Sequence, residues 1–96
     1  MISGNFSAET PKSPGFIKLE IKPDGTALLL NVAAIHLPPV ELERLETKLK
    51  RANDGALCFA EKPKTVEPCL VSADESAVVV KLVPDGTQLK LVKTDK

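Results

Sequence analysis

Cys58 and Cys69 are the two residues whose spacing best supports a defined chemistry. They lie in two short apolar stretches, 56–61 and 66–72, which flank the turn-forming segment 62–65. If these stretches form a hairpin with a four-residue loop, the two cysteines lie directly opposite each other. Opposed strand residues have Cα atoms roughly 4.5–5.5 Å apart, and a disulfide accepts roughly 4.4–6.8 Å. The pair is therefore a disulfide candidate, and two reduced thiols are the alternative.

The other reactive side chains match no common catalytic or metal-binding pattern. His36 is the only histidine, and a Cys–His nucleophile would also need an orienting group and an oxyanion hole. The spacing of His36, Cys58 and Cys69 fits no common zinc pattern. Asp24 and Asp85 lie in turns without the closely spaced oxygen ligands of a calcium loop. We therefore predict no catalytic residue, no metal, no cofactor and no enzymatic activity.

The composition argues against several classes of partner. The chain has 96 residues, 13 basic and 13 acidic, so its formal net charge is zero. Bulk electrostatics therefore favours neither nucleic acid nor an anionic membrane. Tyr and Trp are absent and only three Phe are present, which removes the usual residues for stacking on bases. No apolar run reaches the roughly 18–20 residues of a membrane helix, so no integral membrane segment is expected.

A pair of similar segments, 17–30 and 78–91, organises the predicted fold. Each consists of an alternating apolar run, a Pro-Asp-Gly-Thr turn and a second apolar run. The turn residues are Pro23, Asp24 and Gly25 in the first copy, and Pro84, Asp85 and Gly86 in the second. Proline presets φ, aspartate bonds to the nearby backbone and glycine tolerates positive φ, so both copies are predicted to be β-hairpins.

Burial is expected to set the register of both hairpins. A loop of even length pairs Ile21 with Leu28, and in the second copy Leu82 with Leu89. A three-residue loop would pair Ile21 with Ala27 instead. The even loop keeps the paired side chains apolar in both copies, and in the second copy it turns the lysines Lys81 and Lys90 to solvent.

The segment from Pro39 or Val40 to about Asn53 is predicted to be a helix. Acidic residues lie early in it and basic residues late, which complements the helix dipole. An apolar stripe has helical spacing: Leu42, Leu45, Leu49 and Ala52. On this interpretation the three nearby carboxylates belong to an exposed helix face rather than to an acid–base pair: Glu41, Glu43 and Glu46.

These elements together predict an α+β fold in the order β-β-α-β-β-β-β. Six strands with short connections would form an antiparallel, strongly curved sheet or small barrel, with one helix over a face or an opening. Residues 1–15 are rich in small polar residues, proline and glycine, and are expected to form a flexible N-terminal arm. Residues 16–93 would form a single domain.

Two stretches resemble small bacterial envelope proteins. Gly4-Asn5-Phe6 and residues 16–27 resemble the opening hairpin of lipocalin-like copper-resistance lipoproteins. Residues 82–91 resemble the Asp-Gly hairpins of the C-type lysozyme-inhibitor family. The chain lacks the Cys-x-x-Cys of the first family and the Trp-Lys-Gly of the second, so no functional residue is carried over. The resemblance implies an envelope location.

The leading hypothesis is a non-enzymatic periplasmic or secreted domain that binds another protein through a strand edge or a hairpin loop. One alternative is a carrier for a small apolar ligand, held between Leu28, Leu30, Leu45 and Val80 in a cavity of several hundred Å³. Another is a cytosolic regulatory or phage-type adaptor with free thiols.

Overall fold

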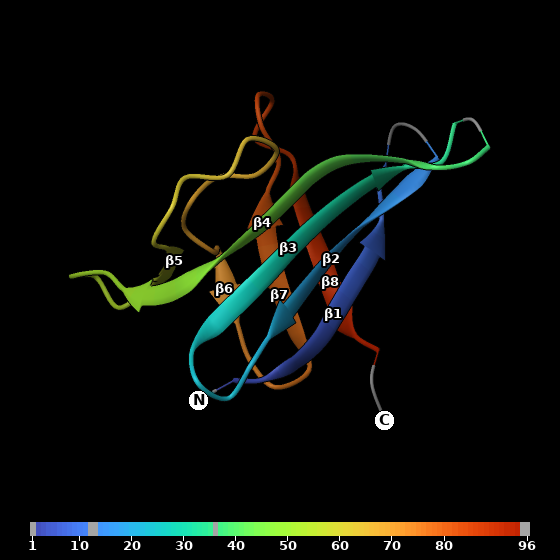
Figure 1. Ribbon diagram of the computed structural model, residues 1–96. Coiled ribbons are helices and arrows are strands. Elements are labelled where there is room, and N and C mark those ends of the chain that lie inside the picture. Colours follow the sequence, from blue (N-terminus) through green and yellow to red (C-terminus); the bar gives the residue numbers. More distant parts are fainter. Residues whose placement is uncertain (1, 12–13, 36, 95–96) are drawn as a thin grey trace.

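The computed structural model describes residues 2–11, 14–35 and 37–94. Eight strands make up its secondary structure (Figure 1): β1 Gly4–Glu9, β2 Gly15–Ile21, β3 Thr26–Ala33, β4 Val40–Arg51, β5 Leu57–Phe59, β6 Ser72–Ala73, β7 Ala77–Lys81 and β8 Gln88–Lys93. None of the described residues is helical, so none forms a helix that could cross a membrane. The predicted α+β class is wrong, because the fold is all-β.

The sheet is antiparallel and nearly closes on itself. Its strand order is β5-β4-β3-β2-β1-β8-β7-β6. The segment between β5 and β6 joins the two ends of this order, since Cys69 bridges to Cys58 and Val66 bridges to Leu82. A barrel-like molecule results, from which the β3–β4 connection projects at the upper right of Figure 1.

The interior is filled by side chains from most of the strands. The largest fully buried ones are Phe6, Ile17, Leu19, Ile21, Leu29, Leu91, Val66, Val78 and Val80. Burying an aliphatic or aromatic side chain of this size contributes about 1.5–3 kcal/mol. The apolar inner faces of the β2–β3 and β7–β8 hairpins therefore contribute most of the core, and both hairpins organise the fold as predicted.

Residues 4–9 form β1 rather than part of the flexible arm predicted for residues 1–15. β1 pairs with β2 along its whole length, from Gly4 opposite Ile21 to Glu9 opposite Phe16. The side chain of Phe6 is fully buried, which anchors the strand in the core. The sequence signal for this strand was weak, because its period-two pattern is short and runs through small and polar residues.

The helix predicted between residues 39 and 53 is also wrong, because the segment is the longest strand, β4. It pairs with β3 from Thr26 opposite Lys48 to Ala33 opposite Val40, with a register shift between Asn31 and Val32. Tertiary pairing of this length outweighs the modest helix propensity of a charged, leucine-containing segment. The helical stripe is split between two faces as a result: Leu45 and Leu49 face inward, and Leu42 is exposed.

The first hairpin has a register different from the predicted one. Ile21 lies opposite Ala27, and Leu19 lies opposite Leu29. The Lys22 N–H donates to the Thr26 carbonyl at 2.9 Å, which leaves a three-residue loop. Because the loop has an odd number of residues, Ala27 and Leu29 are buried in the interior. Leu28 and Leu30 therefore lie on the outer face.

The second hairpin has an even loop, but it is shifted by two residues from the prediction. Val80 lies opposite Leu89, and the Leu82 N–H donates to the Thr87 carbonyl at 2.7 Å. A shift of two residues keeps each side chain on its predicted face. Lys81 and Lys90 are accordingly exposed, as predicted.

Candidate interaction surface

The structure joins Cys58 and Cys69 by a disulfide at the seam of the barrel. The predicted register is confirmed around the pair, since Cys58 bridges antiparallel to Cys69. The Phe59 N–H donates to the Pro68 carbonyl at 2.7 Å, and the Leu70 N–H to the Leu57 carbonyl at 2.8 Å. The predicted strand 66–72 is reduced to isolated bridges and to the start of β6. Cys69 is exposed and Cys58 is half-buried, so the disulfide lies near the surface.

A buried carboxylate holds the rest of this seam. Glu43 faces inward from β4 and is 8% exposed. It accepts hydrogen bonds from the Lys64 N–H at 2.7 Å, the Thr65 N–H at 2.9 Å and the Thr65 hydroxyl at 2.5 Å. Four residues further along the same face of β4, the Thr47 hydroxyl accepts a bond from the Glu61 N–H at 3.2 Å. These side chains tie the chain that crosses the barrel end to β4.

The other side chains that could take part in catalysis or metal binding are dispersed over the structure. The three carboxylates of β4 do not lie together, because Glu43 is buried while Glu41 and Glu46 are exposed. Asp24 and Asp85 lie in separate turns, and His36 lies outside the described residues. Within the described ranges, no three His, Cys, Asp or Glu side chains are grouped to hold a metal ion.

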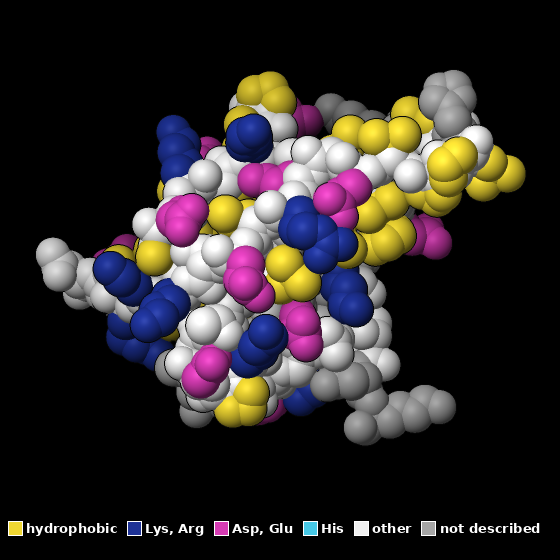
Figure 2. Space-filling model, in the orientation of Figure 1, with side chains coloured by type: hydrophobic (Ala, Val, Ile, Leu, Met, Phe, Trp, Pro, Cys, Tyr) yellow, Lys and Arg dark blue, Asp and Glu magenta, His cyan; other side chains and the backbone are white. Residues whose placement is uncertain are grey.

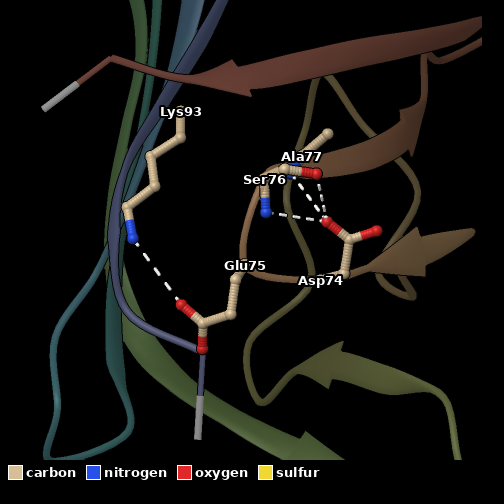
Figure 3. A network of polar contacts seen from close by, with 5 residues as sticks. All are labelled: Asp74, Glu75, Ser76, Ala77 and Lys93. Atoms are coloured by element: carbon tan, nitrogen blue, oxygen red, sulfur yellow. Dashed lines mark hydrogen bonds and ion pairs between the residues drawn. The ribbon is translucent and has the colours of Figure 1, made fainter.

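Aspartates organise several turns by accepting local hydrogen bonds. In Figure 3, Asp74 accepts bonds from the Ser76 N–H at 2.8 Å, the Ser76 hydroxyl at 2.7 Å and the Ala77 N–H at 3.0 Å. The hydroxyl bond is the main cause that lowers the pKa of Asp74 below its ordinary 3.8. The Thr26 hydroxyl likewise lowers the pKa of Asp24. These contacts shape turns, as the sequence predicted for Asp24.

The hollows in the described structure are surface features. Three of them measure about 480–560 Å³ and are open to solvent; one is lined mainly by charged residues, and the other two by a mixture of polar and apolar residues. The four residues expected to enclose an apolar ligand do not surround one space: Leu45 and Val80 face the interior, but Leu28 and Leu30 lie on the outer face. The carrier interpretation therefore gains no support from the packing.

An exposed apolar group occupies the projecting end of the β3–β4 hairpin. We define the hairpin tip by its four exposed apolar residues, Ile35, Leu37, Val40 and Leu42, with exposed fractions of 58%, 92%, 51% and 55%. Figure 2 shows hydrophobic side chains gathered on this projection at the upper right. Isolated exposed leucines are ordinary, whereas a group of them on a protrusion marks an interaction site.

The outer face of β2, β3 and β4 carries a second pattern. Its outward side chains form three cross-strand rows, in which the outer positions are charged and the β3 position is leucine or threonine. The rows are the first basic row (Lys18, Leu30, Arg44), the acidic row (Glu20, Leu28, Glu46) and the second basic row (Lys22, Thr26, Lys48). The alternation of blue and magenta around exposed apolar atoms is visible in Figure 2. We call this surface the striped face.

Sequence reasoning missed both surfaces because it assigned β4 to a helix. A helix would have placed Leu42 with the core stripe and would have separated Arg44 and Glu46 from β2 and β3. The signal that could have revealed the strand is the alternation of a charged residue with an uncharged one over residues 44–49.

The sequence matches no family model and no curated protein, and the structure matches no solved structure.

Proposed function

We propose that this chain is a non-enzymatic domain of an oxidising compartment, periplasmic or extracellular, that binds another protein through the hairpin tip. The observation that carries the proposal is the exposure of four neighbouring apolar side chains on a projecting hairpin, above all Leu37 at 92%. Each large aliphatic side chain contributes about 1.5–3 kcal/mol when it is buried, so a partner that covers this tip would gain substantial binding free energy.

The shape of the hairpin supports the same function. The tip lies beyond the closed part of the sheet, where a partner could contact it from several sides (Figure 1). A hairpin loop fits the recognition of a groove or pocket, in which a few apolar anchors provide most of the affinity. The strand edge is the less favoured route, because part of the edge of β4 is already paired with β5 and with the Ala60 N–H.

The disulfide supports the proposed compartment. Such bonds persist mainly in extracellular and periplasmic environments, because the cytosol keeps thiols reduced. Alkylation of denatured protein from its native source tests this point. Both cysteines should be blocked before reduction and reactive after it, whereas two free thiols would favour the cytosolic adaptor.

Site-specific photo-crosslinking tests the binding function. A benzophenone side chain at Leu37 is compared with one at Val83, an exposed valine in the other Pro-Asp-Gly turn. Cross-linking in the native source should give one protein adduct from position 37 and none from position 83. Leu37→Asp should then weaken binding of the purified partner at least about tenfold, the cost of losing one buried anchor, and Val83→Asp should leave it unchanged. Equal adducts from both positions, or full affinity in Leu37→Asp, would refute the proposal.

A further inference from the structure

The charges of the striped face form a pattern that is complementary to itself. Along each strand, outward side chains recur every two residues, roughly 6.6–6.8 Å apart. Across the striped face, the charge of the rows therefore changes from positive to negative and back to positive. Both β2 and β4, which flank β3, follow this order. Down the centre runs a partly buried apolar strip formed by Leu28, Leu30 and Val32.

Part of this charge has no ion-pair partner among the residues that the structure describes. Lys22 pairs with Glu46 at 3.7 Å, and Arg44 pairs with Glu41 at 2.8 Å. Lys18 and Glu20 form no ion pair with any residue that the structure describes. Both are half-buried rather than fully extended into solvent. Two opposite charges on one strand, two residues apart, are thus available to charges from outside the chain.

We propose that two copies of this chain associate through the striped face, with their sheets packed face to face about a two-fold axis. The axis crosses the strands between the first basic row and the acidic row. This rotation places Lys18 against the partner's Glu20, and Arg44 against the partner's Glu46. By symmetry, the same two contacts recur with the two chains exchanged. Leu30 then meets the partner's Leu28, so the apolar strip is covered at the same time.

The charges select this arrangement over the other symmetric one. A two-fold axis along β3 would place Lys18 against the partner's Arg44 and Glu20 against the partner's Glu46. Both are like-charge contacts, which cost binding free energy. The proposed axis makes every contact in the central rows attractive, and a two-fold interface repeats each contact. Charge complementarity therefore identifies a second copy as the occupant of this face.

The remaining contacts are compatible with this arrangement. Phe16 lies one row beyond Lys18, opposite Val32, and its ring is 38% exposed. The rotation brings it over the partner's Lys22, a pairing that permits a cation–π contact. The Phe16 row reaches Glu41 on β4, so this interface adjoins the hairpin tip at Leu42. The charged pairs that define the interface contain no hairpin-tip residue, and self-association does not depend on the proposed partner-binding function.

Reciprocal charge reversal tests the proposal. Sedimentation equilibrium is measured up to about 1 mM chain, because an interface confined to three strands is small and small interfaces are weak. The wild-type chain should approach the mass of two chains. Lys18→Glu and Glu20→Lys should each weaken the dimer at least about tenfold, since two attractive contacts become repulsive. Lys81→Glu, on the outer face of β7, is the matched control and should dimerise like the wild type.

Mixing the variants distinguishes this interface from others. Equimolar Lys18→Glu and Glu20→Lys should restore a two-chain mass, because the acidic face of one opposes the basic face of the other. The double variant Lys18→Glu/Glu20→Lys should also dimerise by itself. Association should weaken in high salt. A wild-type chain that stays monomeric at the highest concentration overturns the proposal, as does a dimer unaffected by either single reversal, which would indicate the edge of β4 or the hairpin tip.

Discussion

At the residue scale, Glu43 is the side chain that most departs from expectation. A glutamate on the inner face of a strand would ordinarily be costly to bury. Here both carboxylate oxygens accept hydrogen bonds, and the three donors come from residues more than twenty positions further along the chain. Glu43 therefore acts as a structural acceptor that positions the crossing segment over the end of the barrel.

Replacing Glu43 should measure this contribution. Glu43→Ala leaves the Lys64 and Thr65 N–H groups without their acceptor, so the free energy of unfolding should fall by about 2–4 kcal/mol. Thr65→Val removes the hydroxyl donor but keeps both N–H bonds, and it should cost about 1 kcal/mol. Urea denaturation at neutral pH provides both values. Equal stability of Glu43→Ala and the wild type would show that the carboxylate does not hold the seam.

At the element scale, β4 shows why a local pattern was insufficient. Its inner face alternates Glu43 and Thr47 with Leu45 and Leu49, so period-two hydrophobicity is masked by two polar residues. Their polarity is satisfied only because residues 61, 64 and 65 donate to them from a distant segment. The sequence around residues 40–51 carries no trace of those donors, and the helical spacing of its leucines was the stronger local signal.

The hairpins show what could be predicted. Both Pro-Asp-Gly-Thr segments form turns, because proline, aspartate and glycine each favour a turn by a local mechanism. Their loop lengths differ, however, although the four residues are the same: the Gly25 N–H donates to the Lys22 carbonyl, and the Gly86 N–H donates to the Leu82 carbonyl. The flanking residues and their burial set the register, and turn chemistry alone does not.

The turn between β6 and β7 should give the fold an acid-sensitive element. The pKa of Asp74 lies below 3.8, first because the Ser76 hydroxyl bonds to its carboxylate. A depressed folded-state pKa stabilises the fold above the unfolded value, and this contribution is lost as pH falls through the folded value. Asp74→Asn should therefore lower the thermal midpoint at neutral pH, and its difference from the wild type should shrink below about pH 4.

Ser76→Ala provides the companion measurement. It removes the largest cause of the depressed pKa while leaving the charge of Asp74 in place, so it should reduce the same acid dependence in part. Thermal unfolding followed by circular dichroism between about pH 2 and pH 7 covers the window in which the carboxyl titrates. A constant difference between Asp74→Asn and the wild type at every pH would contradict the interpretation.

At the scale of the whole molecule, the disulfide lies where the two ends of the sheet meet. The segment that contains Cys69 bonds to β5 on one side, and on the other the Glu67 N–H donates to the Lys81 carbonyl at 2.8 Å. The register of the two cysteines was predicted correctly from the sequence, although the expected four-residue loop did not form, since Val66 pairs with Leu82. The role of this pair in closing a barrel was not predicted, because it depends on where β7 lies.

Removing the disulfide should consequently loosen the seam more than the rest of the sheet. The sequence separation of 11 residues corresponds to a loss of about 2–3 kcal/mol in the free energy of unfolding of Cys58→Ser/Cys69→Ser, on the chain-entropy account. Hydrogen exchange should accelerate most at the Phe59 and Leu70 amides, which bond across the seam. The β2–β3 amides should accelerate only as far as the global loss requires, because their ladder is independent of the bridge. Equal acceleration of exchange at all amides would contradict this prediction. It would mean that the bridge stabilises the fold as a whole, and that the seam does not open as a separate unit.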